Sequence, residues 1–245
     1  MNAGIPHRSA GPASVIRTLY IFPHAGGSAG SYVPFSRAFS IDLKRIAVQY
    51  PGRADRHDVP DITSISALAD DIYRMMAPTI DSGAAFFGHS MGGLVAFEVA
   101  RKLEAAGRPI AALFVSASSA PGHIGYEYLQ GSDDDLLKMV TDLTGTDAQF
   151  IGEQFGAKVL RTLRNYGAIT DYSCPPGTTL SCPIYAYAAA EDGAISYESV
   201  LAWSGFTTSE FAVRVLPGDH FYVTEDVREL VKDVEQRISQ SGSGK

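Results

Sequence analysis

Ser90 lies in the pattern Gly88-His89-Ser90-Met91-Gly92, a spacing that can turn a serine hydroxyl into a nucleophile. Because this hydroxyl attacks poorly on its own, enzymes hold it on a sharp strand-to-helix turn where its oxygen projects. Such a turn forces the serine to positive φ, and Gly88 and Gly92 lack the Cβ atoms that would collide there. An ordinary turn is the alternative. The apolar stretch before Ser90 and the apolar helical pattern after it favour a nucleophile.

An acid and a histidine that could complete such a site follow later in the chain. Asp192 comes just after a predicted strand over 183–188, and His220 just after one over 211–216. His220 would take the proton of Ser90 and later deliver it to the leaving group, while Asp192 would hold the imidazole tautomer. Both residues could instead be ordinary loop residues.

Two further carboxylates compete for the acidic role. Glu191 directly precedes Asp192 and is its rival. Asp219 is adjacent to His220, and neighbouring side chains rarely point at each other, so we expect Asp219 to cap its turn. The choice between Glu191 and Asp192 stays open at this point.

The loop after the first predicted strand is a candidate for half of an oxyanion hole. It reads Pro23-His24-Ala25-Gly26-Gly27-Ser28 and lacks both the Lys-Ser/Thr ending of a P-loop and the spacing of a dinucleotide fingerprint. We expect the backbone N–H groups of Ala25 and Met91 to bind the developing negative oxygen. Removing one such donor costs about 3 kcal/mol in comparable enzymes, so this loop matters as much as the serine.

Strands alternate with helices over most of the chain, which predicts an α/β fold with a largely parallel sheet and helices on both faces. Ser64 is expected to cap the second helix. Arg53 follows the second strand, where open sheets place ligand crevices, although a surface salt bridge explains it more simply. The predicted strands are 15–22, 45–50, 84–87, 110–116, 183–188 and 211–216; the predicted helices are 32–39, 65–80, one directly after Ser90, 133–143, 153–169 and 225–238.

The region from about 118 to 181 interrupts the alternation and is most simply a helical lid over the site. Within it, Lys158, Arg161 and Arg164 recur every three residues on one helical side. They form either a solvated face or a docking patch for an acidic protein partner. Three aromatic residues could line a substrate chamber or belong to the core of the lid: Tyr126, Phe150 and Tyr172.

Length and composition are those of one globular domain. The chain has 245 residues, 45% of them hydrophobic, and a formal charge of −7, which argues against nucleic-acid binding. We expect a disordered N-terminus over 1–13, a single domain over 14–238 and a flexible tail over 239–245. With no signal peptide and no membrane-length apolar run, a cytoplasmic protein is expected.

The remaining residues with metal or redox chemistry offer no site. The histidines lack metal-ligand spacing, so no metal and no cofactor are predicted. Cys174 and Cys182, each just before a proline, are expected to be free thiols.

Four motifs in order resemble the discrete type II thioesterases of polyketide and nonribosomal peptide synthases. They are Phe22-Pro23-His24-Ala25-Gly26-Gly27-Ser28, Tyr50-Pro51-Gly52-Arg53, Phe87-Gly88-His89-Ser90-Met91-Gly92-Gly93 and Pro217-Gly218-Asp219-His220-Phe221-Tyr222. The stretch Ser116-Ala117-Ser118-Ser119-Ala120-Pro121-Gly122-His123 is similar to members from actinobacterial complex-lipid and polyketide pathways.

This resemblance spans about residues 15–238 and implies the α/β-hydrolase fold. It implies hydrolysis of acyl groups from the phosphopantetheine arm of acyl or peptidyl carrier proteins. Ser90, Asp192 and His220 are then the triad, and Ala25 and Met91 line the oxyanion hole. One departure concerns the acid: the family usually has a Gly-Asp-x-Asp turn, whereas this chain has Ala189-Ala190-Glu191-Asp192.

Other activities fit the same residues. A carboxylesterase or lipase acting on small oxygen esters would use the same triad, because the triad does not distinguish its leaving group. Acyl transfer to an acceptor other than water also fits, and a non-catalytic scaffold that binds a synthase is the alternative of another class. Rates on matched thioester and oxygen-ester substrates separate the first two activities.

Overall fold

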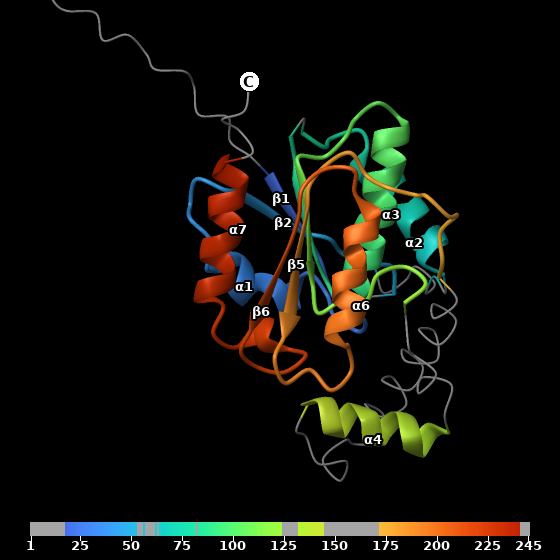
Figure 1. Ribbon diagram of the computed structural model, residues 1–245, viewed down its shortest axis with the longest axis vertical. Coiled ribbons are helices and arrows are strands. Elements are labelled where there is room, and N and C mark those ends of the chain that lie inside the picture. The colour runs from blue at the N-terminus through green and yellow to red at the C-terminus, as the bar shows by residue number, and fades with distance from the viewer. Residues whose placement is uncertain are drawn as a thin grey trace, which may run out of the picture.

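Six parallel strands form the central sheet of the molecule, in the order β2-β1-β3-β4-β5-β6 (Figure 1). The computed structural model describes residues 18–52, 56, 62, 64–81, 83–123, 132–144 and 172–240. Every residue of β1, β3 and β4 is buried, as expected for parallel strands covered on both faces. The strands are β1 (Thr18–Phe22), β2 (Lys44–Ala47), β3 (Ala85–His89), β4 (Ala112–Ser116), β5 (Ile184–Ala189) and β6 (Phe211–Leu216).

Helices cover both faces of this sheet. Figure 1 shows α1 (Val33–Arg37) and α7 (Arg228–Gln240) on one face. The other face carries α2 (Ile65–Met76), α3 (Met91–Ala105) and α6 (Tyr197–Leu201). The described residues also form the short 3-10 helices η1 (Gly30–Tyr32), η5 (Ala202–Phe206) and η6 (Tyr222–Thr224).

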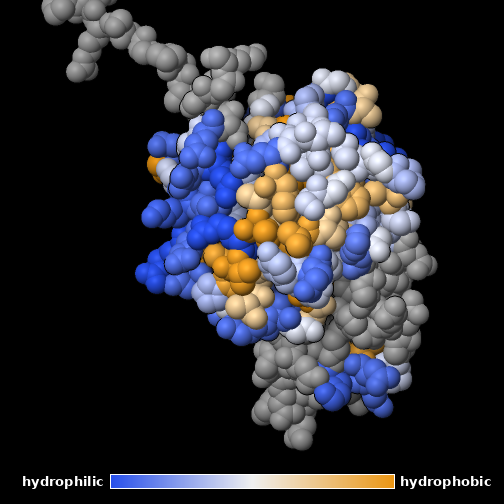
Figure 2. Space-filling view, in the orientation of Figure 1, coloured by the Kyte–Doolittle hydropathy of each residue, from blue (hydrophilic) through white to orange (hydrophobic). Residues whose placement is uncertain are grey.

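The apolar side chains form two cores, one on each face of the sheet. In α2 the buried residues Ile65, Leu68 and Ile72 recur at helical spacing, and each such burial contributes about 1.5–3 kcal/mol. Trp203, which is fully buried, meets Phe97 of α3 edge-on with ring centroids 5.4 Å apart. On the opposite face α7 buries one apolar side, and Figure 2 shows the outward surface around it to be hydrophilic.

The predicted α/β-hydrolase architecture is confirmed, with differences at the ends of some elements. β2 ends at Ala47 because Gln49 and Tyr50 turn toward the loop after β1: the Gln49 side chain accepts from the Ala29 N–H at 3.0 Å. The last helix covers Arg228–Gln240 instead of 225–238, and Asp226 accepts the Arg228 N–H at its start at 3.2 Å. The helical segment formed by α6 and η5 was not predicted. Its first turn is capped by Ser196, which accepts from the Ser199 N–H.

The cap of α2 agrees with the sequence prediction, although this helix ends at Met76 and the predicted helix ended at 80. The Ser64 hydroxyl accepts from the Ala67 N–H at 3.2 Å and so starts α2 as expected. Gly107, just beyond the end of α3, has a φ of +73°. At such a φ a residue with a side chain is strained, which is why glycine suits the end of a helix.

The predicted insertion is described in part. Its first helix is α4 (Asp133–Thr144), which lies beyond the end of the sheet toward which β5 points (Figure 1). Tyr172, at the other end of the insertion, is buried in the core and donates to Glu98 of α3 at 2.7 Å, so it is a core residue. The predicted helix 153–169, the Lys158, Arg161 and Arg164 side, Arg53, Tyr126 and Phe150 lie outside the described residues. The covering function of the insertion therefore stays a prediction.

Within the described ranges, none of the helices combines the length and apolarity that a membrane crossing requires.

Candidate active site

Ser90 occupies the turn between β3 and α3 with φ 54° and ψ −126°, a left-handed conformation that side chains rarely adopt. Its backbone N–H donates to the Ser116 carbonyl of β4 at 2.8 Å, which fixes the turn to the neighbouring strand. The two flanking positions, Gly88 and Gly92, have no room for a Cβ atom. A Cβ on Gly88 would lie 2.3 Å from the Gly92 carbonyl oxygen, and one on Gly92 would lie 2.1 Å from that of Phe22.

His220 and Asp192 complete a hydrogen-bonded chain with this serine. The Nε2 atom of His220 lies 3.0 Å from the Ser90 Oγ, and Nδ1 lies 2.9 Å from Asp192 Oδ2. All three side chains are buried, with Ser90 and His220 exposed by only 7% and 6%. Because a carboxylate only accepts, Asp192 selects the tautomer with its proton on Nδ1 and leaves Nε2 able to accept from Ser90.

The two adjacent carboxylates have different partners. The second oxygen of Asp192, Oδ1, accepts the backbone N–H groups of Ala194 and Ile195 at 2.8 and 3.0 Å, so the carboxylate is held on both sides. Glu191 instead accepts the Gly218 N–H at 2.6 Å, and its own N–H donates to the Gly218 carbonyl at 3.0 Å. Asp192, and not Glu191, therefore contacts the histidine.

Asp219 has the expected local role. Its carboxylate accepts the Phe221 N–H at 2.7 Å and so caps the turn that carries His220. The Glu191–Gly218 pair and this cap together fix the loop from both sides of the histidine.

The two predicted oxyanion donors lie on adjacent elements. Ala25 follows the end of β1, which pairs with β3, and Met91 is the first residue of α3. The N–H of Met91 has no acceptor within its own helix, because first-turn donors never do. The close approach of Gly92 to the Phe22 and Pro23 carbonyls brings the start of α3 against the loop that carries Ala25.

Tyrosines hold the loop after β1 in place. The Tyr50 hydroxyl donates to the Pro23 carbonyl at 2.9 Å, and the Tyr32 hydroxyl lies 2.8 Å from His24 Nδ1. Both tyrosines are buried. Neither contact could be found from the sequence, because each depends on how distant segments meet.

A second buried polar group beside the triad was also missed. His89 Nδ1 lies 3.0 Å from Ser116 Oγ, which in turn lies 2.6 Å from the Tyr222 hydroxyl. Burial, followed by the nearby His220 and His24, holds the pKa of His89 well below its usual 6.5, so this imidazole is neutral. The available signal was a pair of polar residues, His89 and Ser116, at the ends of two otherwise apolar strands.

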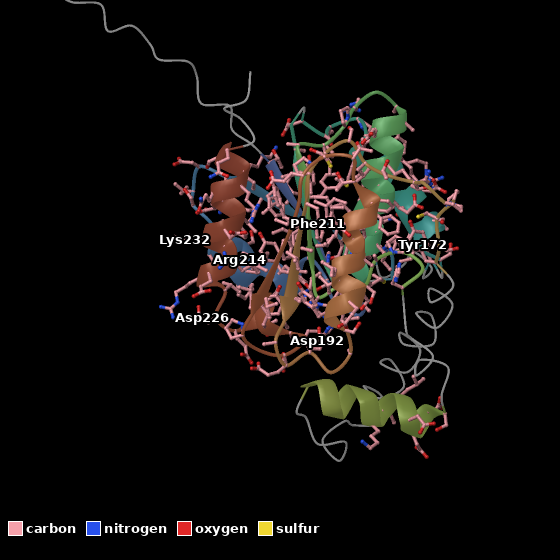
Figure 3. All side chains as sticks on the ribbon, in the orientation of Figure 1. Tyr172, Asp192, Phe211, Arg214, Asp226 and Lys232 are labelled. Atoms are coloured by element: carbon pink, nitrogen blue, oxygen red, sulfur yellow. The ribbon has the colours of Figure 1, made fainter. Side chains whose placement is uncertain are left out.

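The site lies at the carboxyl edge of the parallel sheet, where open α/β sheets place their ligands. Figure 3 shows Asp192 at this edge, on the side of the sheet that faces α4. Among the described residues no cluster of three or more His, Cys, Asp or Glu side chains is arranged to hold a metal ion. Cys174 and Cys182 are free, as predicted.

A buried serine, histidine and aspartate joined in this order at the edge of such a sheet define a serine hydrolase of the α/β-hydrolase fold. Residues 17–238 match the thioesterase domain family, and the chain belongs to that family. It is a thioester hydrolase.

Similar proteins agree with this assignment. The chain is 51% identical over 222 residues to the thioesterase TesA of Mycobacterium marinum, covering 89% of each protein. The solved structure of RedJ, a thioesterase from the prodiginine pathway of Streptomyces coelicolor, superposes with a TM-score of 0.83 at 31% identity, covering 97% of this chain and 91% of that one. BorB, a type II thioesterase from the borrelidin biosynthetic cluster, gives a TM-score of 0.80 at 33% identity, covering 94% and 95%.

Proposed function

We propose that this enzyme is a type II thioesterase that hydrolyses acyl groups from the phosphopantetheine arm of an acyl or peptidyl carrier protein. In this role it would clear stalled or misprimed units from a polyketide, nonribosomal peptide or complex-lipid synthase. The observation that carries the proposal is the continuous chain from Ser90 Oγ through His220 to Asp192, in a member of the thioesterase family.

In the first half of the proposed reaction, Ser90 Oγ attacks the thioester carbonyl carbon and its proton passes to His220 Nε2. Asp192 stabilises the imidazolium that forms. The backbone N–H groups of Ala25 and Met91 stabilise the negative oxygen of the tetrahedral intermediate. The carbon–sulfur bond then breaks, His220 delivers its proton to the departing pantetheine sulfur, which leaves as a thiol, and an acyl-Ser90 ester and a neutral His220 remain. The bond to sulfur breaks more readily than the bond to an ester oxygen would, because a thiol is a stronger acid than an alcohol and its sulfur is the better leaving group.

In the second half, His220 removes a proton from water, which attacks the acyl-Ser90 carbonyl. A second tetrahedral intermediate collapses, the carboxylic acid is released, and the proton returns to Ser90 Oγ. The proposed reaction uses no metal and no cofactor of the enzyme itself, because the phosphopantetheine belongs to the carrier protein.

The names of the similar proteins support the proposal that the substrate is bound to a carrier protein. RedJ and BorB come from biosynthetic pathways, and BorB is described as a type II thioesterase. The role of Lys158, Arg161 and Arg164 in carrier docking remains a prediction. Charge reversal at all three should slow turnover of a carrier-bound acyl group, and unchanged turnover would remove the idea.

The experiment that tests the proposal compares three substrates: an acyl carrier protein, the same acyl group on free pantetheine, and the matching oxygen ester. We expect fastest turnover of the carrier-bound thioester, with free carboxylic acid as the product and no activity in Ser90→Ala. Faster turnover of the oxygen ester would identify a carboxylesterase, and an acylated acceptor in place of the acid would identify a transferase. Failure of Ser90 to react with a fluorophosphonate would revive the non-catalytic scaffold.

A further inference from the structure

Ser116 makes hydrogen bonds to both the nucleophile turn and the histidine loop. Its backbone carbonyl accepts the Ser90 N–H at 2.8 Å. Its hydroxyl lies 3.0 Å from His89, directly before the nucleophile, and 2.6 Å from Tyr222, two residues after His220. Ser116 is wholly buried at the end of β4, between the two segments that carry the reacting groups.

From this arrangement we propose that Tyr222, Ser116 and His89 form a positioning chain that sets the distance between the Ser90 oxygen and His220. This inference rests on the proposed function and adds residues that position its triad. None of the three residues touches the reacting atoms through its own hydrogen bonds, so they act by holding Ser90 and His220.

The Tyr222 end of the chain is rigidly held. The residue is 3% exposed, and its N–H donates to the Asp219 carbonyl at 3.2 Å, which closes the turn around His220. Gly218 has a φ of +105°, and a Cβ there would lie 2.9 Å from the Tyr222 Cβ, so the turn packs tightly against the tyrosine. Burial raises the pKa of the Tyr222 hydroxyl, which therefore stays protonated and able to donate at working pH.

The His89 end of the chain lies against the catalytic histidine. Its ring centroid is 5.3 Å from that of His220, and Nδ1 is oriented by Ser116. The other ring nitrogen, Nε2, is buried, and the His220 backbone lies close enough to the ring to affect its pKa. A neutral ring at this place packs against His220 without adding a second positive charge when His220 becomes an imidazolium.

The positioning chain therefore connects segments that are far apart in the sequence, since Ser116 and Tyr222 are 106 residues apart. Without the positioning chain, the hydrogen bond from Ser90 to His220 would depend on the strands, on Asp192 and on the Glu191–Gly218 and Asp219–Phe221 contacts of the loop. A misplacement of about 1 Å can cost about 100-fold in rate. Because His89, Ser116 and Tyr222 are all buried, loss of the positioning chain should lower kcat and leave KM nearly unchanged.

The test uses Tyr222→Phe and Ser116→Ala, with Tyr187→Phe as the matched control. Tyr187 is also buried, and its hydroxyl also makes a side-chain hydrogen bond, to Asp233 at 2.7 Å on α7. The primary measurement is the second-order rate of Ser90 labelling by a fluorophosphonate, which reports the triad whatever the natural substrate is. Steady-state kcat and KM on an acyl thioester and the thermal midpoint are measured on the same samples.

We expect labelling and kcat to fall about 10- to 100-fold in Tyr222→Phe and Ser116→Ala, with KM within about twofold of native. Tyr187→Phe should lower the thermal midpoint without slowing labelling. Native labelling rates in both Tyr222→Phe and Ser116→Ala, or an equal slowing in Tyr187→Phe, would overturn the positioning chain. Normal labelling of the native enzyme without thioester turnover would contradict the proposed function and leave this test intact.

Discussion

Replacing the two adjacent carboxylates one at a time should give opposite results. Asp192→Asn presents an amide to His220 Nδ1, which either favours the wrong tautomer or removes the negative charge that stabilises the imidazolium. In serine proteases this change lowers kcat by about 10⁴, or about 5.5 kcal/mol of transition-state stabilisation. We expect a loss of the same order here, because Asp192 contacts His220 at 2.9 Å with its side chain buried.

Glu191→Gln keeps an oxygen acceptor for the Gly218 N–H and removes only the charge from that hydrogen bond. Such a change costs on the order of 1 kcal/mol, so kcat should stay within about fivefold of native. The assay is steady-state hydrolysis of an acyl thioester by the two variants, with thermal unfolding to show that both are folded. An equal loss in the two variants, or less than about a tenfold loss in Asp192→Asn, would refute the assignment of the acid.

Three further outcomes follow from the structure. Gly92→Ala should destabilise the protein by about 1–3 kcal/mol and abolish most activity, because the new Cβ would lie 2.1 Å from the Phe22 carbonyl oxygen of β1. Gly205→Ala is the control, because a Cβ at Gly205 would have no atom within 4 Å. Equal stability and activity of the two variants would contradict the steric role of Gly92. The pKa of His89 lies well below 6.5 in the folded state, so just below pH 6.5 only the unfolded state binds a proton at this imidazole. The free energy of unfolding should therefore fall by about 1.4 kcal/mol per pH unit, through His89, as the pH decreases below 6.5. Denaturant titrations at several pH values should show that His89→Gln lacks this contribution to the pH dependence of the free energy of unfolding. An unchanged pH dependence in His89→Gln would contradict a neutral His89 ring in the folded state. Tyr172→Phe should reduce the free energy of unfolding by about 1–3 kcal/mol, because it removes a donor from buried Glu98, and a native value would refute that role.

The parallel sheet and the positions of the serine and the histidine could be predicted, because they depend on local signals. Alternating apolar strands and amphipathic helices specify a parallel sheet. Gly88 and Gly92 mark the strained turn, whose φ of 54° at Ser90 bears out the steric argument. His220 and Asp192 both follow strands, and parallel strands bring their carboxyl ends to one edge.

The choice of acid needed the structure, because Glu191 and Asp192 are adjacent and equally placed after β5. Only the turn that directs Asp192 toward Ala194 and Ile195 decides which side chain reaches the histidine. The contact of Ser116 with Tyr222 was likewise unpredictable, since it joins residues on β4 and η6 with no periodic signal between them.

The short segment α6–η5 escaped prediction for a different reason. Five-residue helices carry too little periodicity to be recognised, and Trp203 anchors this one by donating to the Ser118 carbonyl at 2.8 Å. Tertiary packing, and not local propensity, therefore forms this part of the fold.

The proposed function requires that Ser90 removes acyl groups from carrier proteins. Intact-mass analysis of a panel of acylated carrier proteins, after exposure to the native enzyme or to Ser90→Ala, tests it most directly. The native enzyme should return at least one carrier to its free phosphopantetheine mass, with transient acylation of the enzyme, and Ser90→Ala should change none. Retention of the acyl mass on every carrier, or equal loss with Ser90→Ala, would contradict it.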